Sequence, residues 1–64
     1  MTSREIIQTL RDDGWVCVHV KGDHHQFTHP KKPGRVTVVH PRKDFPIGTL
    51  KSMEKQSGLK LRKR

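Results

Sequence analysis

Four of the five histidines of this chain lie close together, between residues 19 and 29. They are His19, His24, His25 and His29, and all but the first belong to the stretch VKGDHHQFTHP at residues 20–30. Histidine is uncommon in protein cores, and its ring titrates near neutral pH. A cluster of imidazoles therefore suits general acid–base chemistry or metal binding, and the alternative is that the rings are surface or packing residues.

The strand that carries these histidines decides which ring reaches solvent. Gly22 marks a tight turn before the strand, because glycine adopts a positive φ without steric cost. Phe27 is the only large apolar residue of the strand and should face the core, and His25 and His29 share its face because side chains alternate. We expect these two as partly buried, hydrogen-bonded rings. His24 should be exposed on the opposite face, at the start of the strand.

A metal site is a poor fit to this spacing. His25 and His29 lie on one face, but four strand residues span about 13 Å, whereas zinc ligands lie roughly 2 Å from the ion. The single cysteine, Cys17, excludes both a CxxC site and an internal disulfide, and we interpret it as a half-buried strand residue. We interpret His19 and His40 as surface or packing residues. We therefore expect no metal and no other cofactor.

The exposed ring of His24 is the one best placed for catalysis. Fourteen Lys and Arg against six Asp and Glu give a net charge of +8, which favours a nucleic acid, although an acidic protein partner fits the charge as well. An imidazole in this setting could take the proton of a ribose 2′-hydroxyl or give one to the leaving oxygen. Lys21, Arg42 and Lys43 are candidate phosphate contacts by proximity and charge, and Gly22 would let the backbone approach the substrate.

The remaining segments predict two helices and two further strands. Thr2 and Glu5 have the spacing of a capping box at the start of a helix over residues 2–15, which Gly14 and Trp15 should end. Its apolar residues recur at helical spacing and form one stripe, Ile6, Ile7 and Leu10. A second helix is expected over residues 46–57, with a buried stripe of Ile47, Leu50 and Met53.

Three strands are expected between the helices, at residues 16–20, 24–29 and 35–40. The first of them, VCVHV, should turn Val16, Val18 and Val20 to one face and Cys17 and His19 to the other. This order predicts an α+β fold, an α-β-β-β-α two-layer sandwich with both helices on one face of a three-stranded antiparallel sheet.

Chain length and hydropathy limit the number of domains and the possible membrane segments. Sixty-four residues make one domain, and no apolar run is long enough for a signal peptide or a membrane span. We expect a soluble, cytoplasmic protein with no membrane partner and no small-molecule ligand. The run KLRKR at residues 60–64 should be a disordered basic tail beyond a domain of residues 1–59.

Four stretches closely resemble the HicA family of bacterial toxins. They are DDGW at residues 12–15, KGDHHQFTHP at 21–30, KKPGRVTV at 31–38 and HPRKDFPIGTLKS at 40–52, and the resemblance covers residues 1–59. It implies a small toxin of a type II toxin–antitoxin system with a fold like the double-stranded-RNA-binding domain. It also implies a ribosome-independent, metal-independent endoribonuclease that cleaves mRNA and is held inactive by a HicB-like antitoxin, which we expect to cover His24. The family's catalytic histidine is the first of the pair, here His24, and its preceding glycine corresponds to Gly22.

One position departs from the family pattern. Asp23 stands where the family most often has serine, between the glycine and the histidine pair. Its carboxylate could orient the His24 ring, as carboxylates do in catalytic triads, or it could repel a phosphate. A non-catalytic module that binds double-stranded or structured RNA is therefore the alternative interpretation.

Overall fold

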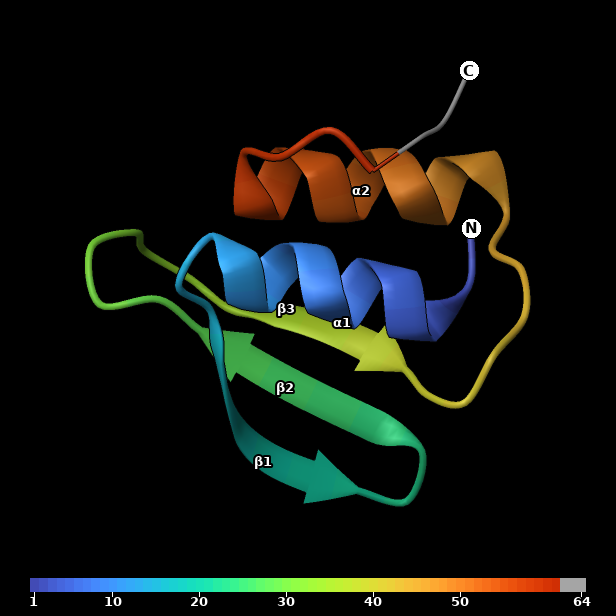
Figure 1. Cartoon of the computed structure of the whole chain (residues 1–64), viewed down its shortest axis with the longest axis horizontal. Coiled ribbons are helices and arrows are strands. Elements are labelled where there is room, and N and C mark those ends of the chain that lie inside the picture. Colours follow the sequence, from blue (N-terminus) through green and yellow to red (C-terminus); the bar gives the residue numbers. More distant parts are fainter. Residues whose placement is uncertain (62–64) are drawn as a thin grey trace.

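The computed structural model of the protein describes residues 1–61, which fold as two helices and three strands. Figure 1 shows both helices on the same side of the sheet, with the other side of the sheet uncovered. The strands are antiparallel in the order β1-β2-β3, so β2 is central. The predicted α-β-β-β-α sandwich is confirmed. The elements are α1 (Ser3–Asp12), β1 (Val16–Lys21), β2 (His24–Thr28), β3 (Val36–Val39) and α2 (Ile47–Ser57).

The first helix begins and ends as its sequence predicts. The Thr2 backbone N–H donates to Glu5 Oε1 at 2.8 Å, and the Glu5 N–H donates to Thr2 Oγ1 at 3.2 Å, which completes the capping box. Gly14 follows the helix with φ of 104°, and the Trp15 N–H donates to the Leu10 carbonyl. This reversal turns the Trp15 indole back into the core, where it is buried.

The core lies between the helices and one face of the sheet. Phe27 is 1% exposed, as the strand pattern predicted, and it pairs with Val36 across β2 and β3. Side chains of directly paired residues share a face, so this pair faces the helices. The pair two positions along, His25 with Val38, lies on the same face. The other buried apolar residues come from both helices, the loops and the chain's C-terminal end: Ile6, Leu10, Trp15, Phe45, Leu50, Met53 and Leu61.

Two predictions from periodicity were wrong. Ile47 was expected in the buried stripe of α2 but is 62% exposed, because it is the first helical residue and α2 reaches the core only from Leu50 onward. In β1, a bulge between Cys17 and His19 interrupts the alternation. Cys17 pairs with Phe27 and His19 with Gln26, so these two residues lie on opposite faces and the predicted single row of valines is broken.

The C-terminal end of the described chain packs on the domain. Leu61 is 1% exposed, and its backbone N–H donates to Glu54 Oε2 at 2.9 Å. The packed chain therefore reaches beyond residue 59, where the sequence placed the end of the domain. The rest of the predicted tail, residues 62–64, lies outside the described residues. Among the described helices, neither is long and apolar enough to cross a bilayer.

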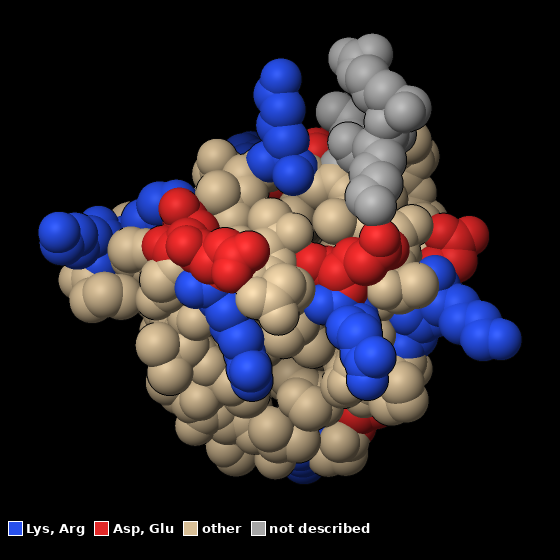
Figure 2. Space-filling view, in the orientation of Figure 1, with Lys and Arg blue, Asp and Glu red and all other residues tan. Residues whose placement is uncertain are grey.

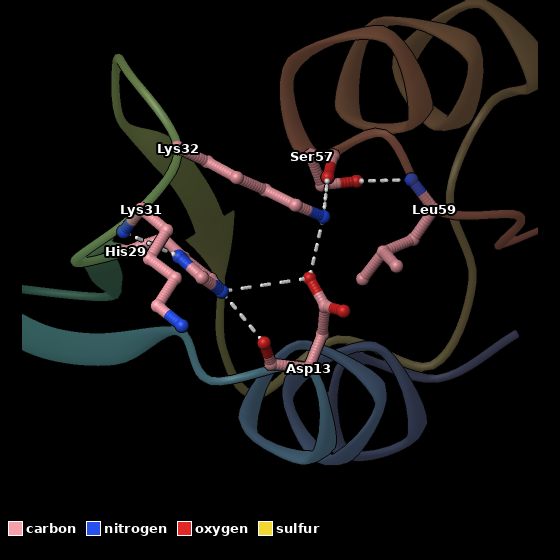
Figure 3. A network of polar contacts seen from close by, with 6 residues as sticks. All are labelled: Asp13, His29, Lys31, Lys32, Ser57 and Leu59. Carbon is pink, nitrogen blue, oxygen red and sulfur yellow. Dashed lines mark hydrogen bonds and ion pairs between the residues drawn. The ribbon is translucent and has the colours of Figure 1, made fainter.

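A polar network joins the ends of α1, β2 and α2 (Figure 3). The ammonium of Lys32 donates to Asp13 Oδ2 at 2.6 Å and to the Ser57 carbonyl at 3.0 Å. His29 accepts from the Lys31 N–H at Nδ1, so Nε2 carries the hydrogen and donates to the Asp13 carbonyl at 2.6 Å. His29 is thus the hydrogen-bonded structural ring that its strand position predicted.

The same ring explains the glycine of the DDGW stretch. A Cβ at Gly14 would stand 2.9 Å from His29 Nε2, and the φ of 104° disfavours any other residue. A side chain at position 14 would therefore have to displace the ring from the Asp13 carbonyl.

Asp13 should make the stability of the fold dependent on acid pH. Its hydrogen bond with Lys32 lowers the pKa of Asp13 below the ordinary value of 3.8. A carboxyl with a lower pKa in the folded chain stabilises above its unfolded pKa, and the effect is lost as the pH falls through the folded pKa. We expect Asp13→Asn to lower the melting temperature at neutral pH, and the difference from the parent chain should shrink as the pH falls below 3.8 and through the lowered pKa of Asp13 in the folded chain.

Thermal melts followed by circular dichroism between acid and neutral pH test this expectation. Asp12→Asn removes the neighbouring carboxylate, which accepts from Gln8, and should cost less at neutral pH. A constant gap between the Asp13→Asn and parent melting temperatures at every pH would contradict the role given to the ion pair.

Candidate functional site

The hairpin between β1 and β2 carries the candidate catalytic histidine. Lys21 pairs with His24, so the loop consists of Gly22 and Asp23 alone. Gly22 has φ of 59°, and a Cβ added there would meet nothing within 4 Å. Glycine is therefore favoured here by the backbone conformation, and the loop surface beside it is open to a substrate.

His24 stands exposed at the start of β2 with an acidic neighbour. Its side chain is 58% exposed, and Nδ1 lies 2.9 Å from Asp23 Oδ1, whose side chain is 59% exposed. An ionised carboxylate only accepts hydrogen bonds, so this contact favours the form of the neutral ring that carries its hydrogen on Nδ1 and leaves the lone pair of Nε2 free. This is the arrangement in which a carboxylate orients an imidazole for proton transfer, although water weakens the contact at this exposure.

Of the predicted phosphate contacts, Lys21 is the one that the strand pairing places directly beside His24. Lys21 is exposed and lies opposite His24 across the hairpin. Arg42 and Lys43 are also exposed, in the loop after β3, and that loop starts beside the hairpin because the His40 N–H donates to the Asp23 carbonyl at 2.7 Å.

The guanidinium of Arg42 is turned toward its own loop. Nε donates to the Asp44 carbonyl at 2.7 Å, and the group lies over the Phe45 ring, 5.0 Å from its centroid. The Arg42 backbone N–H donates to Ser3 Oγ at 2.9 Å, which fixes the loop to the start of α1. Arg42 is therefore held near the site by its backbone, and its side chain would have to turn to reach a phosphate bound at His24.

A second group of side chains lies on the helix side of the sheet, and the sequence did not predict that they come together. The rings of His25 and His40 meet edge to face, with centroids 5.2 Å apart, and His40 Nδ1 lies 2.7 Å from Ser3 Oγ. These rings help to line a hollow of about 380 Å³, together with Arg4, Ile7, Gln8 and Arg11 of α1 and Phe27 of β2. The helical spacing of Arg4, Gln8 and Arg11 was the one available signal, because it places them on one side of α1.

Within residues 1–61, no three His, Cys, Asp or Glu side chains are grouped closely enough to hold a metal ion.

Comparison with known proteins places the chain in a family. The family profile described as "HicA toxin of bacterial toxin-antitoxin" matches residues 3–59. Among solved structures, a chain of a "HicA3 and HicB3 toxin-antitoxin complex" is similar, with 32% sequence identity and a TM-score of 0.83, over 97% of this chain and 100% of that chain. No curated protein matches.

The contact between Asp23 and His24 can be tested by the tautomer of the ring. We expect the neutral His24 ring to carry its hydrogen on Nδ1, because the Asp23 carboxylate lies 2.9 Å from that nitrogen and attracts a hydrogen there. Asp23→Ala should shift the ring toward the Nε2–H form, as read from ¹⁵N chemical shifts of the imidazole at mildly alkaline pH. Asp44→Ala, which removes an exposed carboxylate elsewhere, is the matched control; an identical tautomer in all three proteins would refute the contact.

Proposed function

The chain belongs to the HicA toxin family of bacterial toxin–antitoxin systems, and we propose that it is a metal-independent, ribosome-independent endoribonuclease that cleaves mRNA with His24. The observation that carries this proposal is the exposed His24 ring, with Nδ1 beside Asp23 and Nε2 open to solvent. The family match supports a toxin, and the geometry supports an imidazole that is free to exchange a proton with a substrate.

In the proposed reaction, Nε2 of His24 takes the proton of a ribose 2′-hydroxyl. The 2′-oxygen attacks the adjacent phosphorus, and the bond from phosphorus to the 5′-oxygen breaks. The 5′-oxygen then takes up a proton from the imidazolium or from water. The products are a 2′,3′-cyclic phosphate and a 5′-hydroxyl, so no oxidant, metal or co-substrate is required.

The cationic neighbours have separate roles in this proposal. Lys21 lies across the hairpin from His24 and can contact the scissile phosphate, where negative charge builds in the transition state. Arg42 and Lys43 would hold the RNA on the side where the chain leaves β3. The open surface at Gly22 would let the sugar–phosphate backbone approach the loop.

A non-catalytic RNA-binding module is the second candidate. It is favoured by the position of Asp23, whose exposed carboxylate lies where a phosphate would approach the His24 ring. The same carboxylate orients the ring in the catalytic proposal, so the two candidates differ in whether the chain cuts RNA and not in whether it binds RNA.

We further propose that a HicB-like antitoxin covers His24. The similar solved chain is titled as part of a complex of HicA3 with HicB3. The whole chain carries a net charge of +8, and Val16 is half exposed on the sheet face of His24, because it pairs with Thr28. An acidic partner with an apolar contact would match both features.

Cleavage tests the catalytic role of His24. In buffer with EDTA, the parent chain should cut a labelled structured RNA and leave 2′,3′-cyclic phosphate ends. Loss of a general acid–base in His24→Ala should slow cleavage by about 10²–10⁴-fold while RNA binding is kept. His19→Ala, which removes an exposed ring on the neighbouring strand, should cut at the parent rate. Binding without cleavage by the parent chain would leave the RNA-binding module as the function.

Antitoxin binding should stabilise the chain and shield His24. With free antitoxin at about 100 times its dissociation constant, linkage adds roughly 2.7 kcal/mol, which raises the melting temperature of so small a domain by roughly 10–20 °C. Modification of histidines by diethyl pyrocarbonate, located by mass spectrometry, should fall at His24 in the complex. Full modification of His24 in a complex that is thermally stabilised would place the antitoxin elsewhere on the surface.

A further inference from the structure

The hollow beside α1 has the form of a short groove. One wall is the side of α1 that carries Arg4, Gln8 and Arg11, and the floor is the helix-facing side of β2 with His25 and Phe27. Arg4 and Arg11 are seven residues apart, about 10 Å along the helix axis. In Figure 2, two blue side chains extend from the level of α1 toward the sheet, and the surface between them is hollowed.

The groove carries two arginines beside the apolar Ile7, and it has flat rings at its base. Within residues 1–61, no carboxylate is among the side chains that line it. Of the acidic side chains of α1, Glu5 contacts Thr2, and Asp12 accepts from Gln8, so its carboxylate lies next to the groove without lining it. Guanidinium groups present a planar fork that matches two phosphate oxygens, and ring faces or edges can contact a nucleobase.

The groove is joined to the proposed cleavage site through the backbone. His25, on its floor, follows His24 directly in β2 and points to the opposite face of the sheet. His40, also part of its lining, donates its backbone N–H to the carbonyl of Asp23. The groove therefore ends at the same hairpin that presents the catalytic ring, and a single strand that leaves the groove can turn around this end of the sheet.

We propose that this groove binds the sugar–phosphate backbone of RNA next to the scissile phosphate, with Arg4 and Arg11 as the phosphate contacts. The inference rests on the proposed ribonuclease function and adds a second subsite to it. The volume of about 380 Å³ is at the small end of the range for ligand pockets, roughly 300–1,000 Å³, and suits about one nucleotide. RNA is favoured over an acidic peptide because the cations, the flat rings and the link to the hairpin all lie along one path.

The test measures binding without cleavage. In the full chain with His24→Ala, affinity for a short fluorescein-labelled single-stranded RNA is followed by anisotropy over a series of salt concentrations. The double variant Arg4→Gln/Arg11→Gln should bind roughly tenfold more weakly at low salt. Its salt dependence should flatten by about 0.7 for each lost phosphate contact, or about 1.4 in total.

Two further variants separate a groove contact from a loss of net charge or of folding. Lys51→Gln/Lys55→Gln removes the same charge from the exposed side of α2 and should leave the salt slope unchanged. Arg4→Lys/Arg11→Lys keeps the charge without the guanidinium fork, so it should restore the slope but not the full affinity.

The outcomes distinguish the groove from the function on which it rests. Equal weakening and equal slopes in the arginine and lysine pairs would overturn the groove subsite while leaving the nuclease proposal intact. Unchanged RNA binding with weaker binding of a HicB-like antitoxin would overturn it too, and would assign the groove to a protein partner. A parent chain that does not bind RNA at all would overturn both proposals.

Discussion

The central strand β2 has to serve two faces of the sheet at once, and most of the molecule depends on this constraint. Its alternation sends Phe27 and His25 toward the helices and His24 toward solvent. A shift of one residue would bury His24 and expose Phe27, which is the largest apolar side chain that the strand gives to the core. The energy that fixes the register of β2 is therefore mainly the burial of Phe27. The catalytic proposal uses the face that this burial leaves free.

Both ends of β2 are also held by polar contacts. At its start, the His40 N–H donates to the Asp23 carbonyl and joins the hairpin to the exit of β3. Past its end, His29 donates to the Asp13 carbonyl, and Lys32 links Asp13 to the end of α2. A domain of this size buries little apolar surface, so such contacts between elements matter more than they would in a large protein. They hold the candidate site on a rigid strand even though its own side chains are exposed.

Local patterns in the sequence predicted the parts of the structure that local contacts decide. The capping box, the glycine stop before Trp15 and the face occupied by Phe27 each depend on neighbours a few residues away, and each is confirmed. The bulge in β1 and the exposure of Ile47 depend on how whole elements pair and pack. Strand alternation and helical spacing alone therefore do not predict them. The contact of His25 with His40 joins β2 to the residue that follows β3, and it became visible only when the register of β2 and β3 was known.

An exposed catalytic ring sets a physical limit on the proposed chemistry. Charges at such a site are screened by water, so Lys21 stabilises a developing charge much less than a buried lysine would. Rate must then come from holding the RNA so that its 2′-hydroxyl stays near Nε2, and that requires contacts away from the reacting atoms. The hairpin alone offers few such contacts, whereas the groove lined by Arg4 and Arg11 ends at the same loop. The same exposure makes the His24 ring easy for a partner protein to cover, so a site that is open enough to bind RNA in this proposal is also one that an antitoxin could close.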